Sequence, residues 1–189
     1  MGSAVDDLVA QIRDIYLSDD TPWIVGYSGG KDSTASLQLV WMALESLEPE
    51  QRHKTVYAVT NDTLVENPVV VQWVKRSHDQ IRIGAAEKGL PVEARRLEPI
   101  VDETFWVNLI GRGYPAPNRR FRWCTERMKI HPTSRFIRNV VDKAGQAIIV
   151  LGARKAESAN RAARIAKYDK LAVREHLSPH NDLAAALVY

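Results

Sequence analysis

Cysteine is almost absent from this chain of 189 residues, because Cys124 is the single one. One cysteine excludes an internal disulfide and is typical of a protein from a reducing compartment. Long apolar runs are also missing: the longest, residues 147–153, has the length of a buried strand and not of a membrane span. The N-terminus shows no basic segment followed by an apolar one, as a secretory leader would. We therefore expect a cytoplasmic protein without membrane association.

Strong net charge, internal repeats and low-complexity segments are missing as well. The net charge is +3, and 45% of the residues are hydrophobic. A chain of this length and composition can bury a core of its own. We therefore expect residues 1–189 to form a single domain.

Helical and extended patterns alternate along the chain. Helical periodicity predicts helices over residues 4–17, 33–47, 68–88, 103–109 and 125–144, with a break or a new start at Pro132. Short apolar runs predict strands over residues 23–27, 55–60, 92–97 and 146–151. This alternation predicts an α/β fold, a parallel twisted sheet with helices on both faces. Ligands of such sheets bind at the carboxyl ends of the strands.

Residues 25–34, with the sequence VGYSGGKDST, lie at the end of the first predicted strand. They do not form a Walker A loop, because Val25 stands at the required upstream glycine and Asp32 follows Lys31 in place of Ser or Thr. The dinucleotide-binding pattern Gly-x-Gly-x-x-Gly fails as well, because Ser28 occupies its second glycine. Two common phosphate-binding motifs are therefore excluded.

Residues 26–30 do match the nucleophile elbow Gly-x-Ser-x-Gly, with Ser28 as the nucleophile. That motif normally follows several strands, one of which supplies an oxyanion-hole amide, whereas only one predicted helix precedes the strand here. An acid and a base, such as Asp102 and His131, occur downstream, as they do in most chains of this size. The hydrolase interpretation is therefore disfavoured.

A different phosphate-binding loop fits better. Adjacent Gly29 and Gly30 let successive backbone N–H groups turn toward an anion at the N-terminus of the following helix. Asp32 beside phosphate makes chemical sense if Mg²⁺ or its water shell lies between the two. The plain alternative is a Ser/Gly turn in which Asp32 caps the helix. The side chains that can donate to phosphate are those of Ser28, Lys31 and Ser33.

Polar residues also follow the second and the last predicted strands. Asp62 and Thr63 either contact a nucleotide there or start the next helix, with Asp62 or Asn67 as its cap. Gly152, after the last strand, permits a close approach of the backbone to a ligand, and the Arg154 guanidinium can bind two phosphate oxygens at once. These two motifs and the loop of residues 25–34 all fall at the carboxyl edge of the predicted sheet.

Basic residues are concentrated between Arg112 and Arg138. This segment contains eight basic residues and one acidic residue, Glu126. Its local charge is therefore about +7, whereas the net charge of the whole chain is +3. Phe121 and Trp123 interleave with the arginines, as stacking groups do on nucleic-acid-binding surfaces. Nucleic-acid phosphate, ATP phosphate or an acidic protein partner could each bind here. The candidates for DNA contact are Arg119, Arg120, Arg122, Arg127 and Lys129.

These motifs together resemble the PP-loop ATP pyrophosphatases, which cleave ATP between its α- and β-phosphates and share the adenine nucleotide alpha hydrolase-like fold. SGGKDS is the signature of that superfamily. The segments YSGGKDST, NDTLVENP, RRFRWCTERMKIHPTSRFI and GARKAESANRA are together similar to its DndC/SspD branch. That branch contains the sulfurtransferase components of bacterial DNA phosphorothioation, which are related to phosphoadenylylsulfate reductases. The resemblance extends over most of the chain.

The resemblance implies an enzyme that binds ATP and Mg²⁺, forms AMP and pyrophosphate, and adenylates a DNA backbone phosphate for sulfur insertion. It implies partners: DNA, a cysteine desulfurase as sulfur donor, and other subunits of the phosphorothioation system. It implies catalytic roles for Lys31, Asp32, Cys124 and Arg154, with Asp32 on the metal. The implied nucleotide contacts are Ser28, Gly29, Gly30, Lys31, Asp32, Ser33, Asp62, Thr63, Gly152 and Arg154.

Cys124 lies in the middle of the basic segment. A lone cysteine is more often a small buried apolar residue, but neighbouring positive charge favours the thiolate, which can carry sulfur. DndC-type proteins hold an iron–sulfur cluster on several cysteines, and Cys124 matches one of those positions. This chain cannot form a four-cysteine [4Fe-4S] cluster alone. Either this branch has no cluster, or the chain is the N-terminal part of a longer protein that supplies the other ligands; we expect the second.

Two other functions stay open. A sulfonucleotide reductase resembles the chain in the SGGKDS and Gly-x-Arg regions, but its usual C-terminal nucleophile, Glu-Cys-Gly-Leu-His, is absent. The second open function is that of a non-catalytic subunit, which binds a nucleotide and thereby orders a DNA-facing surface.

Overall fold

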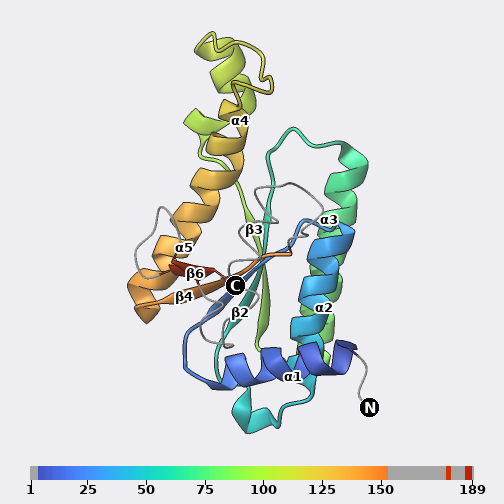
Figure 1. Ribbon diagram of the computed structural model, residues 1–189. Coiled ribbons are helices and arrows are strands. Elements are labelled where there is room, and N and C mark those ends of the chain that lie inside the picture. The colour runs from blue at the N-terminus through green and yellow to red at the C-terminus, as the bar shows by residue number, and fades with distance from the viewer. Residues whose placement is uncertain (1–3, 153–177, 180–185, 189) are drawn as a thin grey trace.

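The computed structural model describes residues 4–152, 178–179 and 186–188 (Figure 1). Its sheet has the strand order β3-β2-β1-β4-β6-β5. The first five of these are parallel to their neighbours, and β5 runs antiparallel to β6. The strands are β1 (Trp23–Gly26), β2 (Val56–Asn61), β3 (Val92–Leu97), β4 (Ala147–Val150), β5 (Ser178–Pro179) and β6 (Ala186–Val188). The predicted parallel sheet is confirmed, and its four predicted strands are found within one residue of their expected ends.

Helices cover both faces of the sheet, as predicted. Helices α1 (Ala4–Leu17), α2 (Lys31–Glu45) and α3 (Pro68–Glu87) lie on one face, and α5 (His131–Ala144) lies on the other (Figure 1). Asn67 caps α3 by accepting a hydrogen bond from the N–H of Val69 (2.9 Å), and Pro68 begins the helix. None of the described helices is long and apolar enough to cross a membrane.

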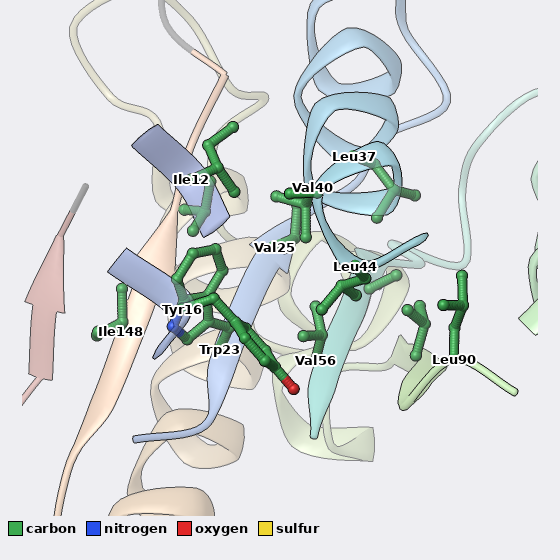
Figure 2. Close-up of a cluster of buried hydrophobic side chains, with 14 of the residues drawn as sticks. Ile12, Tyr16, Trp23, Val25, Leu37, Val40, Leu44, Val56, Leu90 and Ile148 are labelled. Atoms are coloured by element: carbon green, nitrogen blue, oxygen red, sulfur yellow. The ribbon is translucent and has the colours of Figure 1, made fainter. Parts of the chain in front are cut away.

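The core has two layers because the central strands are buried on both faces. Trp23 and Val25 of β1 point toward α1 and α2, where Tyr16, Val40 and Leu44 surround them (Figure 2). Ile24, between them in the chain, points to the opposite face and packs with Ile137 and Val140 of α5. The same alternation divides β4: Ile148 and Val150 join the first layer, Ala147 and Ile149 the second. Strands buried on both faces read as continuous apolar runs, which is why their sequences could be recognised.

The expected new start at Pro132 takes the form of a change in helical register. Helix α4 (Trp123–Thr125) runs into a π-helical segment, η4 (Glu126–Ile130), and then into α5. Pro132 lacks the N–H that an α-helix would need at that point, and it lies in the first turn of α5. The hydroxyl of Thr133, the next residue, donates to the carbonyl oxygen of Lys129 (2.8 Å). The result is one nearly continuous helical rod from residue 123 to residue 144.

Residues 98–130 form an insertion between β3 and α5. It contains a short 3-10 turn, η2 (Val101–Glu103), a π-helical segment, η3 (Val107–Gly111), and the outer end of the helical rod. A second short 3-10 turn, η1 (Pro49–Gln51), lies at the other end of the molecule, between α2 and β2. Figure 1 shows the insertion extending beyond the carboxyl ends of the strands, at the top of the picture.

Candidate functional site

The loop between β1 and α2 lies at the topological switch point of the sheet, where the strand order reverses. From β1 the chain passes through α2 to β2 on one side, whereas β4 pairs with β1 on the other side. In open α/β sheets such a switch point leaves a crevice at the carboxyl ends of the two strands, and ligands bind there. The predicted phosphate-binding residues, 28–33, occupy this position.

Ser33 fixes the shape of this loop. Its hydroxyl donates to the carbonyl oxygen of Gly30 (3.0 Å) and accepts from the backbone N–H of Ser28 (3.1 Å). The Ser28 hydroxyl lies 3.1 Å from the Ser33 hydroxyl, and it must be the donor because the Ser33 proton is already engaged. Gly29 has φ = 72°, a backbone conformation that favours glycine. Ser33 is therefore an organiser of the loop.

The N-terminus of α2 is open toward the crevice end of the sheet. Gly30 is the N-cap residue, has an extended conformation and makes no side-chain cap. The first intrahelical bond of the loop runs from the N–H of Thr34 to the carbonyl oxygen of Gly30 (2.9 Å). An uncapped helix N-terminus has backbone donors and a partial positive charge suited to phosphate. The N-cap residue of α2 is Gly30, whereas the plain alternative expected Asp32 to cap the helix.

Gly152 closes the other side of the crevice. A Cβ atom on Gly152 would lie 2.7 Å from the Ser36 hydroxyl and 2.9 Å from the carbonyl oxygen of Asp32, both in the first turns of α2. Similarly, a Cβ atom on Gly26 would lie 3.0 Å from the side chain of Leu151. Glycine at these positions lets β4 approach α2 and β1. The close approach expected at Gly152 is thus made by α2, and its contact with a nucleotide stays a prediction.

Asp62 and Thr63 also lie at this edge, but their side chains are already engaged. The Asp62 carboxylate accepts from the N–H of Leu64 (2.8 Å) and lies 3.5 Å from the guanidinium of Arg96. This turn holds Leu64 at φ = 62°, which is unusual for a branched side chain. Thr63 is 3% exposed, and its hydroxyl donates to Glu66 (3.2 Å). The backbone of this loop remains for a nucleotide contact.

A buried hydrogen-bond relay supports the phosphate loop from behind, and sequence reasoning missed it. The Thr60 hydroxyl donates to the carbonyl oxygen of Tyr27 (2.5 Å), directly before Ser28. His78 of α3 lies 2.8 Å from the same hydroxyl through Nε2, which must donate because the Thr60 proton is used. Burial, with a further contribution from Arg96, holds the pKa of His78 below its ordinary value. The relay therefore contains a neutral imidazole protonated on Nε2.

An apolar surface borders the loop on the α3 side. Trp73 is 60% exposed, and its indole would lie 3.2 Å from a Cβ atom on Gly29. Four further exposed apolar residues belong to the same β2–α3 segment: Leu64, Val65, Val69 and Val70. Helical periodicity alone does not distinguish this face from a buried one, so the sequence did not reveal it.

Cys124 lies away from the phosphate loop. Asn61, at the end of β2, donates from its side-chain amide to the Thr133 hydroxyl (2.9 Å), which fixes the level at which the helical rod passes the sheet edge. Cys124 is nine residues nearer the N-terminal end of the rod, roughly 13 Å farther out at the rise of a helix. Its side chain is half-buried. The described residues therefore do not bring Cys124 together with Lys31 and Asp32.

The basic segment divides into engaged and solvent-facing residues. Arg135 donates to Glu103 (2.8 Å), and Arg127 donates to the Tyr114 hydroxyl (2.9 Å) with its guanidinium over the Tyr114 ring. Burial raises the pKa of Glu103, but hydrogen bonds from Arg135 and His131 outweigh it and leave this pKa below its ordinary value. Glu103 thus stays ionised and ties the insertion to α5. Within this basic segment, five residues are exposed and have no carboxylate partner among the described residues: Arg119, Arg120, Arg122, Lys129 and Arg138.

The described residues do not form the hydrolase site. The Ser28 hydroxyl bonds to Ser33, and no histidine in the described part of the chain hydrogen-bonds to it. His131 is held by Glu103 (2.5 Å), and Asp102 is largely exposed, 3.8 Å from Arg112. The acid, base and nucleophile of that interpretation are therefore engaged in separate contacts.

The residues present fit magnesium and do not fit an iron–sulfur cluster. Among the residues with described positions, no three His, Cys, Asp or Glu side chains gather as a metal site. Mg²⁺ commonly takes one or two carboxylates and completes its shell with phosphate oxygens and water, so Asp32 at a phosphate site is sufficient. A [4Fe-4S] cluster needs more thiolates than the single Cys124 supplies. Arg154 lies outside the described residues.

The chain is similar to a protein of known sequence and to two solved structures. A protein of Methanocaldococcus jannaschii, itself uncharacterized, is 31% identical over 153 residues, which are 81% of this chain and 27% of that protein. The chain thus spans about a quarter of the length of that relative. Two solved structures are each 14% identical in sequence to the present chain, with a TM-score of 0.48. They are the U34-tRNA thiolase NcsA from Methanococcus maripaludis with its [4Fe-4S] cluster, and the phosphoadenylyl-sulfate reductase from Candida auris in a phosphate complex. The match with the thiolase covers 97% of the present chain and 58% of the thiolase chain. The match with the reductase covers 100% of the present chain and 78% of the reductase chain.

The family model of the phosphoadenosine phosphosulfate reductase domain matches residues 22–172. This range begins just before β1 and contains the phosphate loop, the insertion and β4. The chain therefore belongs to the phosphoadenosine phosphosulfate reductase domain family.

Proposed function

We propose that the chain is the ATP pyrophosphatase part of a sulfurtransferase that modifies DNA, and that it adenylates a backbone phosphate before sulfur is inserted. The observation that carries this proposal is the position of the α2 N-terminus, with Gly30 as its N-cap residue, at the switch point of the sheet behind a loop of the sequence SGGKDS. Gly152 and Ser33 hold this site in shape. It suits the pyrophosphate moiety of ATP.

In the proposed reaction, a non-bridging oxygen of a DNA phosphate attacks the α-phosphorus of ATP. The bond from that phosphorus to the bridging oxygen of pyrophosphate breaks, and pyrophosphate leaves with the electron pair. Lys31 and Arg154 stabilise the charge that develops on the leaving group. Magnesium, held by Asp32 and phosphate oxygens, would supply further charge neutralisation. We place the adenine beside the exposed apolar residues of the β2–α3 segment.

The sulfur step completes the proposed cycle. The terminal sulfur of a persulfide from a cysteine desulfurase attacks the activated DNA phosphorus, and AMP departs with the former phosphate oxygen. A second thiol then cleaves the remaining S–S bond, giving a phosphorothioate and a disulfide. Because Cys124 is the only cysteine of the chain, it can carry at most one of these sulfurs, and a partner must supply the other thiol. We place this chemistry in the cytoplasm, where thiols stay reduced.

Two alternatives give other products. A reductase acting on an adenylylated sulfate would release sulfite, and a nucleotide-binding scaffold would release nothing. The reductase lacks its usual cysteine motif here, and Cys124 lies far from the phosphate loop, so no described residue favours it. The family membership by itself accommodates all three.

Product analysis tests the proposal. The protein is incubated with α-labelled ATP, Mg²⁺, duplex DNA and the sulfur-donating partners, and AMP and pyrophosphate are quantified. We expect equal amounts of both, and a loss of about 10²–10³-fold in turnover for Lys31→Ala, since it removes one charge from the leaving-group site. Lys143→Ala, an exposed lysine in the last turn of α5, is the matched control and should turn over normally. ADP as product, sulfite from an adenylylated sulfate, or no turnover would each reject the proposal.

A further inference from the structure

The outer end of the insertion contains a rigid turn built on Asn118. Its side-chain oxygen accepts hydrogen bonds from the N–H groups of Arg120 (2.9 Å) and Phe121 (3.0 Å). Its own N–H donates to the carbonyl oxygen of Phe121 (3.1 Å). Three hydrogen bonds within four residues fix the backbone, and Pro115 and Pro117 restrict the chain before it. The turn therefore holds Arg119 and Arg120 at its apex.

A row of aromatic rings connects this turn to the buried part of the insertion. Trp123, 4% exposed, stacks on Phe105 (centroids 5.4 Å apart, planes at 22°), and its indole N–H donates to Pro115 (3.0 Å). Tyr114 contacts Trp123 edge to face (5.5 Å, 88°), and Phe121 follows at 6.5 Å from Tyr114. Phe121 is 43% exposed. The row thus ends in an exposed ring with a fixed base.

The exposed ring is surrounded by positive charge. Arg119, Arg120 and Arg122 flank Phe121 in the chain, all are exposed, and none has a carboxylate partner in the residues that the structure describes. A solvated protein surface usually mixes the two signs of charge. Arginines around an aromatic ring instead match the backbone phosphates and the base of a nucleotide at the same time.

The chemistry of Phe121 selects the state of the nucleic acid. A phenyl ring has no hydrogen-bonding group, so in a groove it can recognise little besides a thymine methyl group. Its face can stack only on a base whose own face is uncovered, and in a duplex both faces of each base are covered by neighbours. Trp106, at the opposite end of the aromatic row, is also exposed, at 57%, but it lacks the flanking arginines.

We propose that the Asn118 turn binds single-stranded nucleic acid, with an unpaired base stacked on Phe121 and the adjacent phosphates on Arg119, Arg120 and Arg122. This inference rests on the nucleic-acid substrate of the proposed function and specifies its form: the strand is unpaired where it meets the insertion. Asn118 is the positioning residue, because its side chain holds both the arginines and the ring.

The test is a comparison of binding to one labelled 20-nucleotide sequence as single strand and as duplex, by fluorescence anisotropy with the full 189-residue chain. Phe121→Ala should weaken single-strand binding roughly 5- to 150-fold and leave duplex binding within about twofold. Phe121→Leu keeps apolar volume without a π-face and should weaken it similarly, whereas Phe121→Trp should retain it. Trp106→Ala is the matched control and should bind normally. Circular dichroism of each variant verifies the fold.

The outcomes separate this inference from the proposed function. Equal loss of single-strand and duplex binding in Phe121→Ala, an equal effect of Trp106→Ala, or no effect of Phe121→Ala overturns the stacking site. If the chain binds neither form, the DNA substrate of the proposed function fails as well, while pyrophosphate release remains a separate measurement. A parallel RNA single strand should depend on Phe121 to the same degree, since stacking does not involve the 2′-hydroxyl. Preferential binding of acidic polypeptide would instead identify a protein-docking surface.

Discussion

The contact between Gly152 and α2 makes the sharpest prediction about the phosphate site. In Gly152→Ala the new methyl carbon would lie 2.7 Å from the Ser36 hydroxyl and 2.9 Å from the Asp32 carbonyl oxygen. Ordinary contacts begin near 3.4 Å, so the backbone of α2 must move by about half an ångström. A rotation of the Ser36 side chain relieves the first contact and leaves the second, because the second is with backbone.

The expected effect is a loss of about 1–3 kcal/mol in the free energy of unfolding, the usual cost of overpacking. The displacement also moves the first turn of α2, so ATP binding should weaken. Urea unfolding measures the first effect, and calorimetric titration with ATP and Mg²⁺ measures the second. The double variant Ser36→Ala, Gly152→Ala should remain destabilised.

Gly84→Ala is the matched control. A methyl group there meets the Trp41 ring at 3.4 Å, and the residue lies inside α3, where alanine is the better helix former. We expect it to be as stable as the parent or more so, by up to about 1 kcal/mol. If Gly152→Ala unfolds at the parental urea concentration and binds ATP normally, the packing of β4 against α2 is not what shapes the phosphate site.

Three further predictions concern His78, the arginines of the Asn118 turn, and Cys124. Because folding lowers the pKa of His78, the unfolded chain binds more protons than the folded one when the pH is below the ordinary histidine pKa of about 6.5. The free energy of unfolding therefore falls as the pH falls through that value, by at most about 1.4 kcal/mol per pH unit. His78→Gln should remove this part of the pH dependence of urea unfolding, and an unchanged pH dependence would disprove the lowered pKa. Replacing all three exposed arginines of the Asn118 turn by glutamine should weaken binding of single-stranded DNA across sequences, without affecting ATP binding. It should also reduce the log–log salt slope of that binding by about two units, and a constant slope would exclude phosphate contacts from Arg119, Arg120 and Arg122. Cys124→Ser should retain ATP and DNA binding and lose sulfur incorporation in the complete system, because a hydroxyl cannot carry persulfide sulfur, and retained incorporation would make Cys124 a packing residue.

The fold could be predicted because its main signals are local. Short continuous apolar runs such as Trp23–Gly26 and Ala147–Val150 are typical of strands buried on both faces, and the segments between them have helical periodicity. The position of the phosphate loop followed from the same alternation, since a loop after β1 must lie at the carboxyl edge.

Features that depend on distant residues could not be predicted. Thr60, Tyr27 and His78 meet only after β1, β2 and α3 have packed, and nothing in the local sequence indicates a relay. The distance of Cys124 from the loop depends on how the π-helical segment carries the rod past Pro132. The Asn118 turn had a local signal, an asparagine after two prolines, but its link to Phe121 and Tyr114 required the tertiary structure.

The path of one oxygen atom tests the central claim most directly. DNA labelled with ¹⁸O at its non-bridging phosphate oxygens is incubated with the protein, ATP, Mg²⁺ and the sulfur-donating partners in unlabelled water, and the AMP is analysed by mass spectrometry. If a DNA phosphate oxygen attacks the α-phosphorus and sulfur later displaces AMP, the AMP carries one ¹⁸O. AMP without label, formed together with phosphorothioate, would show that the DNA phosphate is not adenylated and would contradict the proposed function.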